Sequence, residues 1–281
     1  MIFTKNKLPS SPDKLFLDLF LEEYWFAPQD VLLRSIEANI WKIVKIDKPS
    51  LDIGIGDGGI SRYIFWGKEP ISIGIDPNPV GLTSGQKTEN YNKILKASAE
   101  KMPFKNATFK TIVSNSTFEH IKHDYKALKE VGRTLKKGGH FFLTVPSEYL
   151  PLNILEIEGN NQEAKKALNF FNNRVAHYHY HSVSEWTKRF EEAGMKVVFS
   201  HLYYGKFITK VWYVLFKIST KKIKNKEIWS YLAHTRLRIL IPVNLYIKFL
   251  RTFLLFPAFK KGFFCSNTEK GSMLFIVGEK I

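Results

Sequence analysis

Short apolar runs alternate along most of the chain with longer segments in which apolar residues recur every three or four positions. The short runs are typical of buried strands, and the longer segments are typical of amphipathic helices. Because the two kinds alternate, we expect right-handed crossovers and an α/β fold with a mostly parallel sheet covered by helices on both faces. Seven strands are predicted, at 51–53, 71–75, 93–95, 111–113, 140–145, 196–200 and 272–277.

Only helices are predicted before the first strand. Ser11 and Pro12 suit the N-cap and first turn of a helix that runs to about Tyr24, and Pro28 suits the start of a second helix. Apolar positions of the second helix fall on one stripe. They are Leu32, Ile36, Ile40, Ile43 and Val44. Residues 1–48 are therefore predicted to form a helical cap beside the sheet.

Two later helices have recognisable boundaries. The segment Ser182–Glu185 has the capping-box pattern, in which a serine and a glutamate three residues apart bond each other's backbone N–H groups. Gly194 suits the end of that helix. An earlier helix is expected to end near Lys137–Gly139, just before the fifth strand.

Positive charge is concentrated in the last quarter of the chain. The formal net charge is +16, and residues 205–270 hold 14 Lys and Arg against two acids. The same segment is rich in aliphatic and aromatic residues, but its longest uncharged apolar run is shorter than the roughly 18–20 residues that span a bilayer. This composition is typical of helices that lie in the membrane interface. RNA contacts, and ordinary packing against a core or a dimer partner, are the alternatives.

The predicted organisation has four parts. Residues 1–48 form the cap, 49–204 a nucleotide-binding core, 205–270 a basic insert, and 271–281 the last strand of the core. The single cysteine, Cys265, excludes an internal disulfide and a cysteine-based zinc site, and it fits a reducing compartment. The first residues lack the apolar segment of a secretory signal, so we expect a cytoplasmic location.

A glycine-rich turn after the first strand is the strongest candidate for a binding site. Gly54, Gly56 and Gly58 permit positive φ angles and let a ligand approach the backbone, while the next helix offers free N–H groups. Asp76 ends the second strand, 22 residues after Gly54. A carboxylate there can accept hydrogen bonds from both hydroxyls of a ribose. The turn therefore predicts a nucleoside cofactor.

Two kinds of cofactor fit this turn, because Gly54, Gly56 and Gly59 also match the G-x-G-x-x-G pattern of nicotinamide enzymes. Asp52, two residues before Gly54, favours S-adenosylmethionine (SAM). Its carboxylate can attract the positively charged amino and sulfonium groups of SAM, whereas it suits a dinucleotide pyrophosphate poorly.

Further segments resemble motifs of the class I SAM-dependent methyltransferases. They are LDIGIGDGGIS at 51–61, AEKMPFKNATFKTIVSNSTFEHI at 99–121, LKKGGHFFLTVP at 135–146 and HYHYHSVSEWTKRFEEAGMKVV at 177–198. The resemblance runs with gaps from about Leu51 to Ser200. It implies a Rossmann-like seven-stranded fold and an enzyme that transfers the methyl group of SAM.

The resemblance also implies a set of cofactor-binding residues. They are Asp52, Gly54, Gly56, Gly58, Asp76, Ala99, Glu100 and Asn115. Asn115 ends the fourth strand, at the carboxyl edge where open α/β sheets bind ligands. Ser98 replaces the aspartate that usually contacts the adenine amino group in this family, so the Ala99 N–H or Glu100 is expected to supply that contact.

Histidines are the candidates for the acceptor side. Residues 177–181 alternate His and Tyr, so an extended chain would place three histidines on one face, and His179 is the preferred general base. A polar edge that only shapes the pocket is the alternative. His120 stands in the family's L-E-H position, where it acts as a base or packs the next helix. We expect no metal, because histidines at i and i+2 without a carboxylate converge poorly.

These patterns predict a SAM-dependent methyltransferase that docks through residues 205–270 on an anionic membrane surface, as a peripheral protein of the inner face. The acceptor would be an oxygen or nitrogen on a lipid, a lipid-linked glycan or a similar amphiphile. Methyl transfer to RNA through the basic insert is one alternative. A nicotinamide enzyme or a SAM-binding regulator with the same fold is another.

Overall fold

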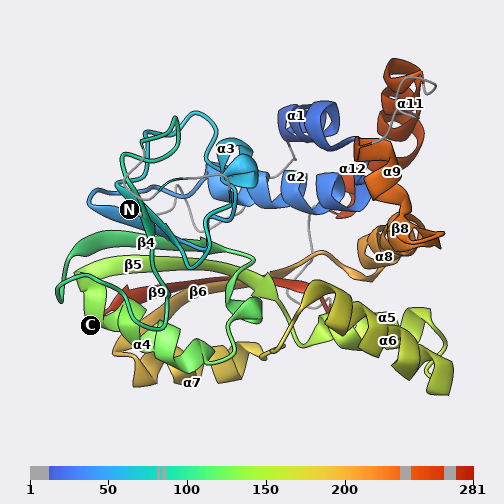
Figure 1. The fold of residues 1–281 in the computed structure, drawn as a ribbon. Helices are drawn as coiled ribbons and strands as arrows, with labels where there is room; N and C mark the ends of the chain where they lie inside the picture. Colours follow the sequence, from blue (N-terminus) through green and yellow to red (C-terminus); the bar gives the residue numbers. More distant parts are fainter. Residues whose placement is uncertain (1–12, 81–82, 84–86, 235–241, 263–269) are drawn as a thin grey trace.

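A seven-stranded sheet forms the centre of the molecule (Figure 1), in a computed structural model that describes residues 13–80, 83, 87–234, 242–262 and 270–281. The strand order is β3-β2-β1-β4-β5-β9-β6, and neighbouring strands are parallel except that β9 is antiparallel to both β5 and β6. The seven predicted strands are confirmed. Their bounds are β1 Ser50–Ile53, β2 Ile73–Asp76, β3 Ile94–Lys96, β4 Phe109–Asn115, β5 Leu135–Pro146, β6 Met195–Tyr203 and β9 Met273–Lys280.

Helices cover both faces of this sheet, which confirms the predicted Rossmann-like α/β class. Their bounds are α1 Lys14–Tyr24, α2 Pro28–Lys42, α3 Gly59–Ile64, the 3-10 turn η1 Phe118–His120, α4 Asp124–Thr134, α5 Tyr149–Ile157, α6 Gln162–Val175, α7 Val183–Glu192 and α8 Lys206–Thr220. In Figure 1, α1, α2 and α3 lie on one side of the sheet, and α4 and α7 lie on the other. Phe142 belongs to the core under the N-terminal helices, whereas its neighbours Phe141 and Leu143 belong to the core against α4 and α7. Successive strand residues point to opposite faces, so one strand contributes to both cores.

The boundaries of α7 follow from local chemistry, as predicted. Ser182 and Glu185 make both hydrogen bonds of the capping box at its start. Gly194 follows its last turn with a φ of +72°. This left-handed conformation favours glycine, because other residues carry a Cβ that collides with the backbone.

Two other helix ends differ from the prediction. Asp13 caps α1 by accepting a hydrogen bond from the Leu15 N–H, whereas Ser11 and Pro12 lie outside the described residues. The helix expected to end near Lys137–Gly139 ends at Thr134, and β5 already begins at Leu135. The early start reflects the pairing of Leu135 with Phe109, which draws this segment into the sheet.

The insert between β6 and β9 folds mainly into helices. They are α8, α9 Ile228–His234, α11 Val243–Phe249, the π-helical turn η2 Leu250–Leu255 and α12 Phe256–Gly262, with a short hairpin of β7 Lys222–Ile223 and β8 Lys226–Glu227. One face of α8 is buried against α2 and α5 through residues such as Ile208, Trp212 and Phe216. Ordinary core packing therefore accounts for that face of the insert. None of the described helices is long and apolar enough to cross a membrane.

Candidate functional site

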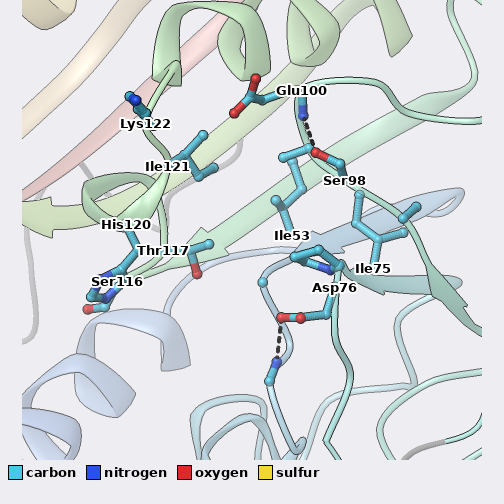
Figure 2. A pocket seen from close by; sticks show the side chains of 15 residues that line it. Ile53, Ile75, Asp76, Ser98, Glu100, Ser116, Thr117, His120, Ile121 and Lys122 are labelled. Atoms are coloured by element: carbon cyan, nitrogen blue, oxygen red, sulfur yellow. Dashed lines mark hydrogen bonds between the residues drawn. The ribbon is translucent and has the colours of Figure 1, made fainter. Parts of the chain in front are cut away.

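A cavity of about 380 Å³ lies at the carboxyl edge of the sheet, beside the glycine turn (Figure 2). We call it the turn cavity. It brings together predicted site residues that are far apart in the sequence, because parallel strands all end at this edge. Its walls are Ile53, Gly54, Gly56, Ile75, Asp76, Pro77, the segment 97–100, Ser116, Thr117 and the segment 120–122.

The turn itself depends on glycine at two positions for different reasons. Gly54 has a φ of +86°, and a Cβ added there would lie 2.2 Å from the Thr117 side chain. Gly56 has a φ of +55° and open space around it, so the cavity comes directly against its backbone. Asp76 holds the turn, since its Oδ2 accepts a hydrogen bond of 3.0 Å from the Gly56 N–H. Gly58 has a φ of +78° at the start of α3 but is not part of the turn cavity wall.

Asp52 faces a second, smaller cavity of about 130 Å³ behind the turn, which we call the inner cavity. Gly54 and Gly56 line both cavities. The Asp52 side chain is 3% exposed and accepts a 2.5 Å hydrogen bond from the Tyr91 hydroxyl. Burial raises the pKa of Asp52 to about 7. A cation in the inner cavity would relieve this burial, because an opposite charge favours the ionised carboxyl.

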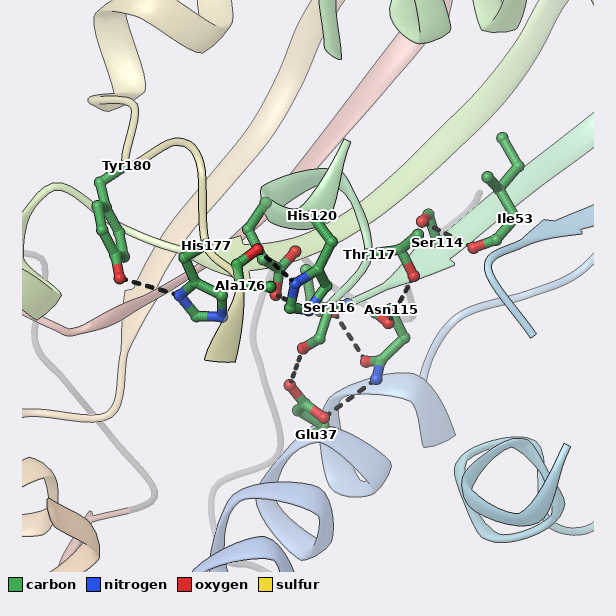
Figure 3. Close-up of polar contacts among 12 residues, drawn as sticks. Glu37, Ile53, Ser114, Asn115, Ser116, Thr117, His120, Ala176, His177 and Tyr180 are labelled. Carbon is green, nitrogen blue, oxygen red and sulfur yellow. Dashed lines mark hydrogen bonds and ion pairs between the residues drawn. The ribbon is translucent and has the colours of Figure 1, made fainter. Parts of the chain in front are cut away.

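Asn115 is held in a network that ties α2 to the end of β4 (Figure 3). Its Oδ1 accepts hydrogen bonds from Trp41 at 2.7 Å and Thr144 at 2.8 Å, and its Nδ2 donates to Glu37 at 3.1 Å. Glu37 also accepts from the Ser116 hydroxyl at 2.8 Å. Asn115 therefore lines the inner cavity with an amide whose hydrogen bonds are already made to protein groups.

A third cavity, of about 160 Å³, adjoins the turn cavity, and we call it the aromatic cavity. Ser116 and His120 line both, so the two cavities meet at these residues. The other walls of the aromatic cavity come from α2, η1, the end of β5, α5, α6 and the segment after it, the residue after β6, α8 and the start of β9. They are Asp30, Leu33, Arg34, Glu119, Pro146, Leu150, Phe171, Val175, His177, Tyr204, Trp212 and Met273.

Four residues that line the aromatic cavity carry a buried polar atom without a hydrogen-bond partner in the described part of the chain. They are Arg34 Nε, Glu119 Oε2, the Tyr204 hydroxyl and Trp212 Nε1. A buried polar group without a partner costs about 1–3 kcal/mol, so such groups are rarely left unpaired in a finished site. Donors and an acceptor in an otherwise apolar cavity fit a small ligand, or a part of one, with polar groups of its own.

Two histidines point their second ring nitrogen into this region. His120 Nδ1 lies 3.1 Å from the Ala176 carbonyl, and His177 Nδ1 lies 3.0 Å from the Tyr180 hydroxyl. A carbonyl only accepts, so Nδ1 of His120 carries the hydrogen and Nε2 of the neutral ring keeps its lone pair. Burial lowers the pKa of both rings, that of His177 to about 3, and raises the pKa of Glu119 to about 8.

His179 lies outside these three cavities, and this corrects the expected arrangement of the histidines. Residues 177–181 form no strand, so the three rings do not share one face. His179 Nε2 lies 3.1 Å from the carbonyls of Ile121 and Lys122, and its ring stacks on His181 at 5.2 Å. Of the histidines at 177–181, His177 therefore lines the aromatic cavity, whereas His179 does not.

Comparison with known proteins identifies the domain around these cavities. Residues 51–143 match the family model described as a methyltransferase domain. This match covers the glycine turn, Asp76 and the L-E-H position. Residues 51–143 form a class I SAM-dependent methyltransferase domain.

Curated relatives of the methyltransferase domain act on different acceptors. The chain is 28% identical over 174 residues to sterol 4-C-methyltransferase of Caenorhabditis elegans, which covers 59% of this chain and 50% of that protein. It is 31% identical over 96 residues to the phthiotriol/phenolphthiotriol dimycocerosates methyltransferase of Mycobacterium leprae, covering 33% of this chain and 36% of that one. The chain thus spans about half or less of the length of these relatives.

Solved structures share the fold of the methyltransferase at low sequence identity. The phosphoethanolamine N-methyltransferase 2 of Haemonchus contortus, solved with phosphomonomethylethanolamine and S-adenosylhomocysteine, has a TM-score of 0.54 and 15% identity over 94% of this chain and 59% of that one. A SAM-dependent methyltransferase of Thermotoga maritima, described as a possible histamine N-methyltransferase, has a TM-score of 0.52 and 17% identity over 95% and 99% of the two chains.

Several residues of the site were not singled out from the sequence. Arg34 and Glu37 of α2 line or brace the cavities, and Tyr91 holds Asp52. A sequence signal existed for the first two, because an arginine and a glutamate three residues apart interrupt the apolar stripe that α2 buries. Tyr91 precedes β3 in a loop and gave no such signal.

Proposed function

We propose that this chain transfers the methyl group of SAM to an oxygen or nitrogen atom of an acceptor that binds in the aromatic cavity. The observation that carries the proposal is the junction of the turn cavity with the aromatic cavity at Ser116 and His120. Methyl transfer is an in-line displacement, so donor and acceptor must approach within about 3 Å from opposite sides of one carbon. Two adjoining cavities, one beside a nucleoside-type turn, meet that requirement.

The residues around the turn fit SAM. When bound, SAM supplies an electrophilic methyl carbon on a positively charged sulfur. Asp76 can accept hydrogen bonds from the ribose hydroxyls, and Ala99 and Glu100 line the part of the turn cavity where we place the adenine. Gly54 and Gly56 leave the backbone open, and Asp52 supplies a buried carboxylate near the cationic end.

The aromatic cavity would hold the acceptor group next to the methyl carbon. Its aromatic and aliphatic walls exclude water, and its unpaired polar atoms can fix the orientation of the acceptor. His120 is the histidine at the junction, so it is the one within reach of the transferred methyl group. A nicotinamide cofactor suits this site less well, because Asp52 lies at the turn where a pyrophosphate would bind.

Calorimetry with SAM and with NADH tests the cofactor assignment on the intact chain. We expect SAM to bind and NADH to bind at least tenfold more weakly, and a preference for NADH would overturn the proposal. Acceptors are sought by incubating lipid, glycan and RNA extracts with the enzyme and SAM that carries a labelled methyl group. Label in a lipid or glycan fraction supports the proposal, and label in RNA alone supports the alternative.

We also propose that the insert docks the enzyme on an anionic lipid surface, where an amphiphilic acceptor is met. The outer face of α8 exposes Phe207, Val214 and Ile218 beside a groove that Leu254 of η2 completes. Phe249 and Phe253 are 56% and 72% exposed and contact each other at 5.6 Å between ring centres. Apolar side chains gathered in this way usually mark a contact surface.

The insert also carries exposed lysines in α8, the β7–β8 hairpin and α11, of which Lys210 lines the groove. They are Lys210, Lys221, Lys222, Lys224, Lys226 and Lys248. Each basic residue near an anionic leaflet contributes about 1 kcal/mol, so the set suits a lipid surface of opposite charge. The groove favours lipid over RNA, because Val214, Ile218 and Leu254 have no ring on which a base could stack.

Vesicle sedimentation tests the docking proposal. The intact chain should bind vesicles that contain phosphatidylglycerol and be released by high salt, while pure phosphatidylcholine retains little. The pair Phe249→Ser and Phe253→Ser should reduce binding at least fivefold. The matched control pair, Tyr125→Ser and Val198→Ser, removes exposed apolar residues of the core and should bind like the wild type. Equal binding of both pairs would overturn the proposal, and salt-sensitive retention of RNA instead would favour the alternative.

A further inference from the structure

Three side chains from two separate parts of the chain converge where the aromatic cavity meets the turn cavity. Glu119 and His120 come from η1, which follows β4, and His177 comes from the segment after α6. One ligand-type atom of each lies within 4.8 Å of the others. Figure 3 shows His120 and His177 side by side, and their ring centres are 5.0 Å apart.

Each of the three side chains keeps one polar atom that makes no hydrogen bond to the described part of the protein. His120 and His177 each make their hydrogen bond through Nδ1, and Nε2 of His120 lies 4.0 Å from Glu119 Oε1. Glu119 is 3% exposed, and its Oε2 has no hydrogen-bond partner in the described part of the chain. A buried carboxylate oxygen is strongly destabilising when unpaired, so it points to a group that is brought in from outside.

The nearby charges favour a cation there. Arg34 also lines this cavity, but its guanidinium is paired with Glu37 at 2.6 Å. Asp30 adds a further carboxyl to the wall of the same cavity. Among the described residues that line the cavity, the ion-pair contact of Glu119 is with His120, at 4.0 Å between Oε1 and Nε2.

We infer that Glu119, His120 and His177 bind a divalent transition-metal ion, which in turn holds an oxygen atom of the methyl acceptor. Two imidazoles and one carboxylate are a common ligand set for zinc, manganese and iron, with remaining positions open to a substrate. The part of this inference in which the ion holds the methyl acceptor rests on the proposed function. The sequence predicted no metal because neighbouring histidines lack convergent geometry, and only one of those histidines takes part in this set.

A second cluster of the same residue types provides an internal contrast. Asp124, His179 and His181 also place their ligand atoms within 4.8 Å of one another. Here both carboxylate oxygens are already engaged, Oδ2 by His181 at 2.6 Å and Oδ1 by Arg189 at 3.0 Å. Because both oxygens of this carboxylate are already bonded to other side chains, this cluster serves as the control.

Metal titration of the untagged full chain, first treated with a chelator, tests the inference. Co²⁺ should bind with a stoichiometry of one and produce visible absorption bands typical of nitrogen and oxygen ligands, and Zn²⁺ should displace it. Glu119→Gln and His177→Ala should each weaken Co²⁺ binding at least tenfold, whereas the control His179→Ala should leave it unchanged. Thermal unfolding and SAM calorimetry of each variant check that the fold and the cofactor site are intact.

The outcomes separate this inference from the proposed function. No Co²⁺ binding by the wild type, or equal weakening by His179→Ala, would overturn the metal site. SAM binding by the chelated wild type would then leave the methyltransferase proposal standing, with a positively charged acceptor group as the partner of Glu119. Conversely, a bound metal without SAM binding would refute the proposed function and keep the metal site.

Discussion

Single residues of the glycine turn impose different constraints on folding and on binding. Gly54 must lack a Cβ because the Thr117 side chain fills that space. Gly56 must lack one because its backbone lines the turn cavity, where a Cβ would take space from the ligand. The first constraint belongs to the folded protein itself, and the second appears only when a ligand approaches the backbone. Substitution of each glycine by alanine can therefore separate the two.

Gly54→Ala should lower both stability and SAM affinity, because its Cβ would lie 2.2 Å from Thr117 in a turn with a φ of +86°. Gly56→Ala should cost only about 1 kcal/mol of stability, the usual penalty for a non-glycine residue at positive φ, while SAM affinity falls at least tenfold. Chemical unfolding and calorimetry measure the two effects. Equal loss of stability in both variants would contradict this assignment.

Asp52 makes stability and cofactor binding depend on pH. Its pKa is raised to about 7 in the folded protein, against about 3.9 in an unfolded chain. Burial of Asp52 therefore costs no folding stability below about pH 4. The loss of stability grows as pH rises from about 4 to 7 and then stays constant. Asp52→Asn should stabilise the protein at pH 8 and have little effect at pH 4, as measured by thermal unfolding.

The same carboxyl should bind SAM more tightly as pH rises through 7, because the cationic ligand favours its ionised form. In calorimetry the Asp52→Asn variant should lose this pH dependence. A wild-type affinity that stays constant between pH 6 and pH 8 would show that Asp52 does not face the cation.

The packing of α4 against the end of α7 explains a glycine in α4, although glycine has a low helix propensity. Gly132 lies in the last turn of α4. A Cβ at this position would lie 2.0 Å from the carbonyl oxygen of Ala193, which follows α7. Close contact between the two helical segments under the sheet thus requires glycine here.

Gly132→Ala should destabilise the protein by about 1–2 kcal/mol, because overpacking costs more than the roughly 1 kcal/mol that alanine adds in helix propensity. The control Lys126→Ala, at an exposed position of the same helix, should change stability by less than about 0.5 kcal/mol. Urea unfolding compares them. Greater stability of Gly132→Ala than of the wild type would contradict the packing argument.

At the scale of the whole molecule, the insert joins the core instead of forming a separable appendage. α8 buries one face against α2 and α5, and Thr209 bonds Ser272 at the start of the last strand with a 2.7 Å contact. The insert therefore completes the aromatic cavity through Trp212 of α8.

Deletion of residues 205–270 should abolish cooperative unfolding and SAM binding, since it uncovers the core under α8 and removes one wall of the aromatic cavity. The Phe249→Ser and Phe253→Ser pair should unfold like the wild type, within about 0.5 kcal/mol, because both side chains are exposed. Circular dichroism during heating measures both. A deleted chain that still folds cooperatively would show that the insert is an independent unit.

The sequence by itself determined the fold class, the seven strands, the glycine turn and the place of Asp76, because these depend on local periodicity and on residues close in the chain. Ala99 and Glu100 also lie in the cavity where the resemblance implied them. Only the tertiary structure decided which histidines reach the site. His177 and His179 look equivalent in an alternating segment, but the chain there is not a strand, so one enters the aromatic cavity and the other bonds to backbone carbonyls. Likewise chain packing brings His177 beside Glu119 and His120, which precede it by 58 and 57 residues, and no local pattern records this.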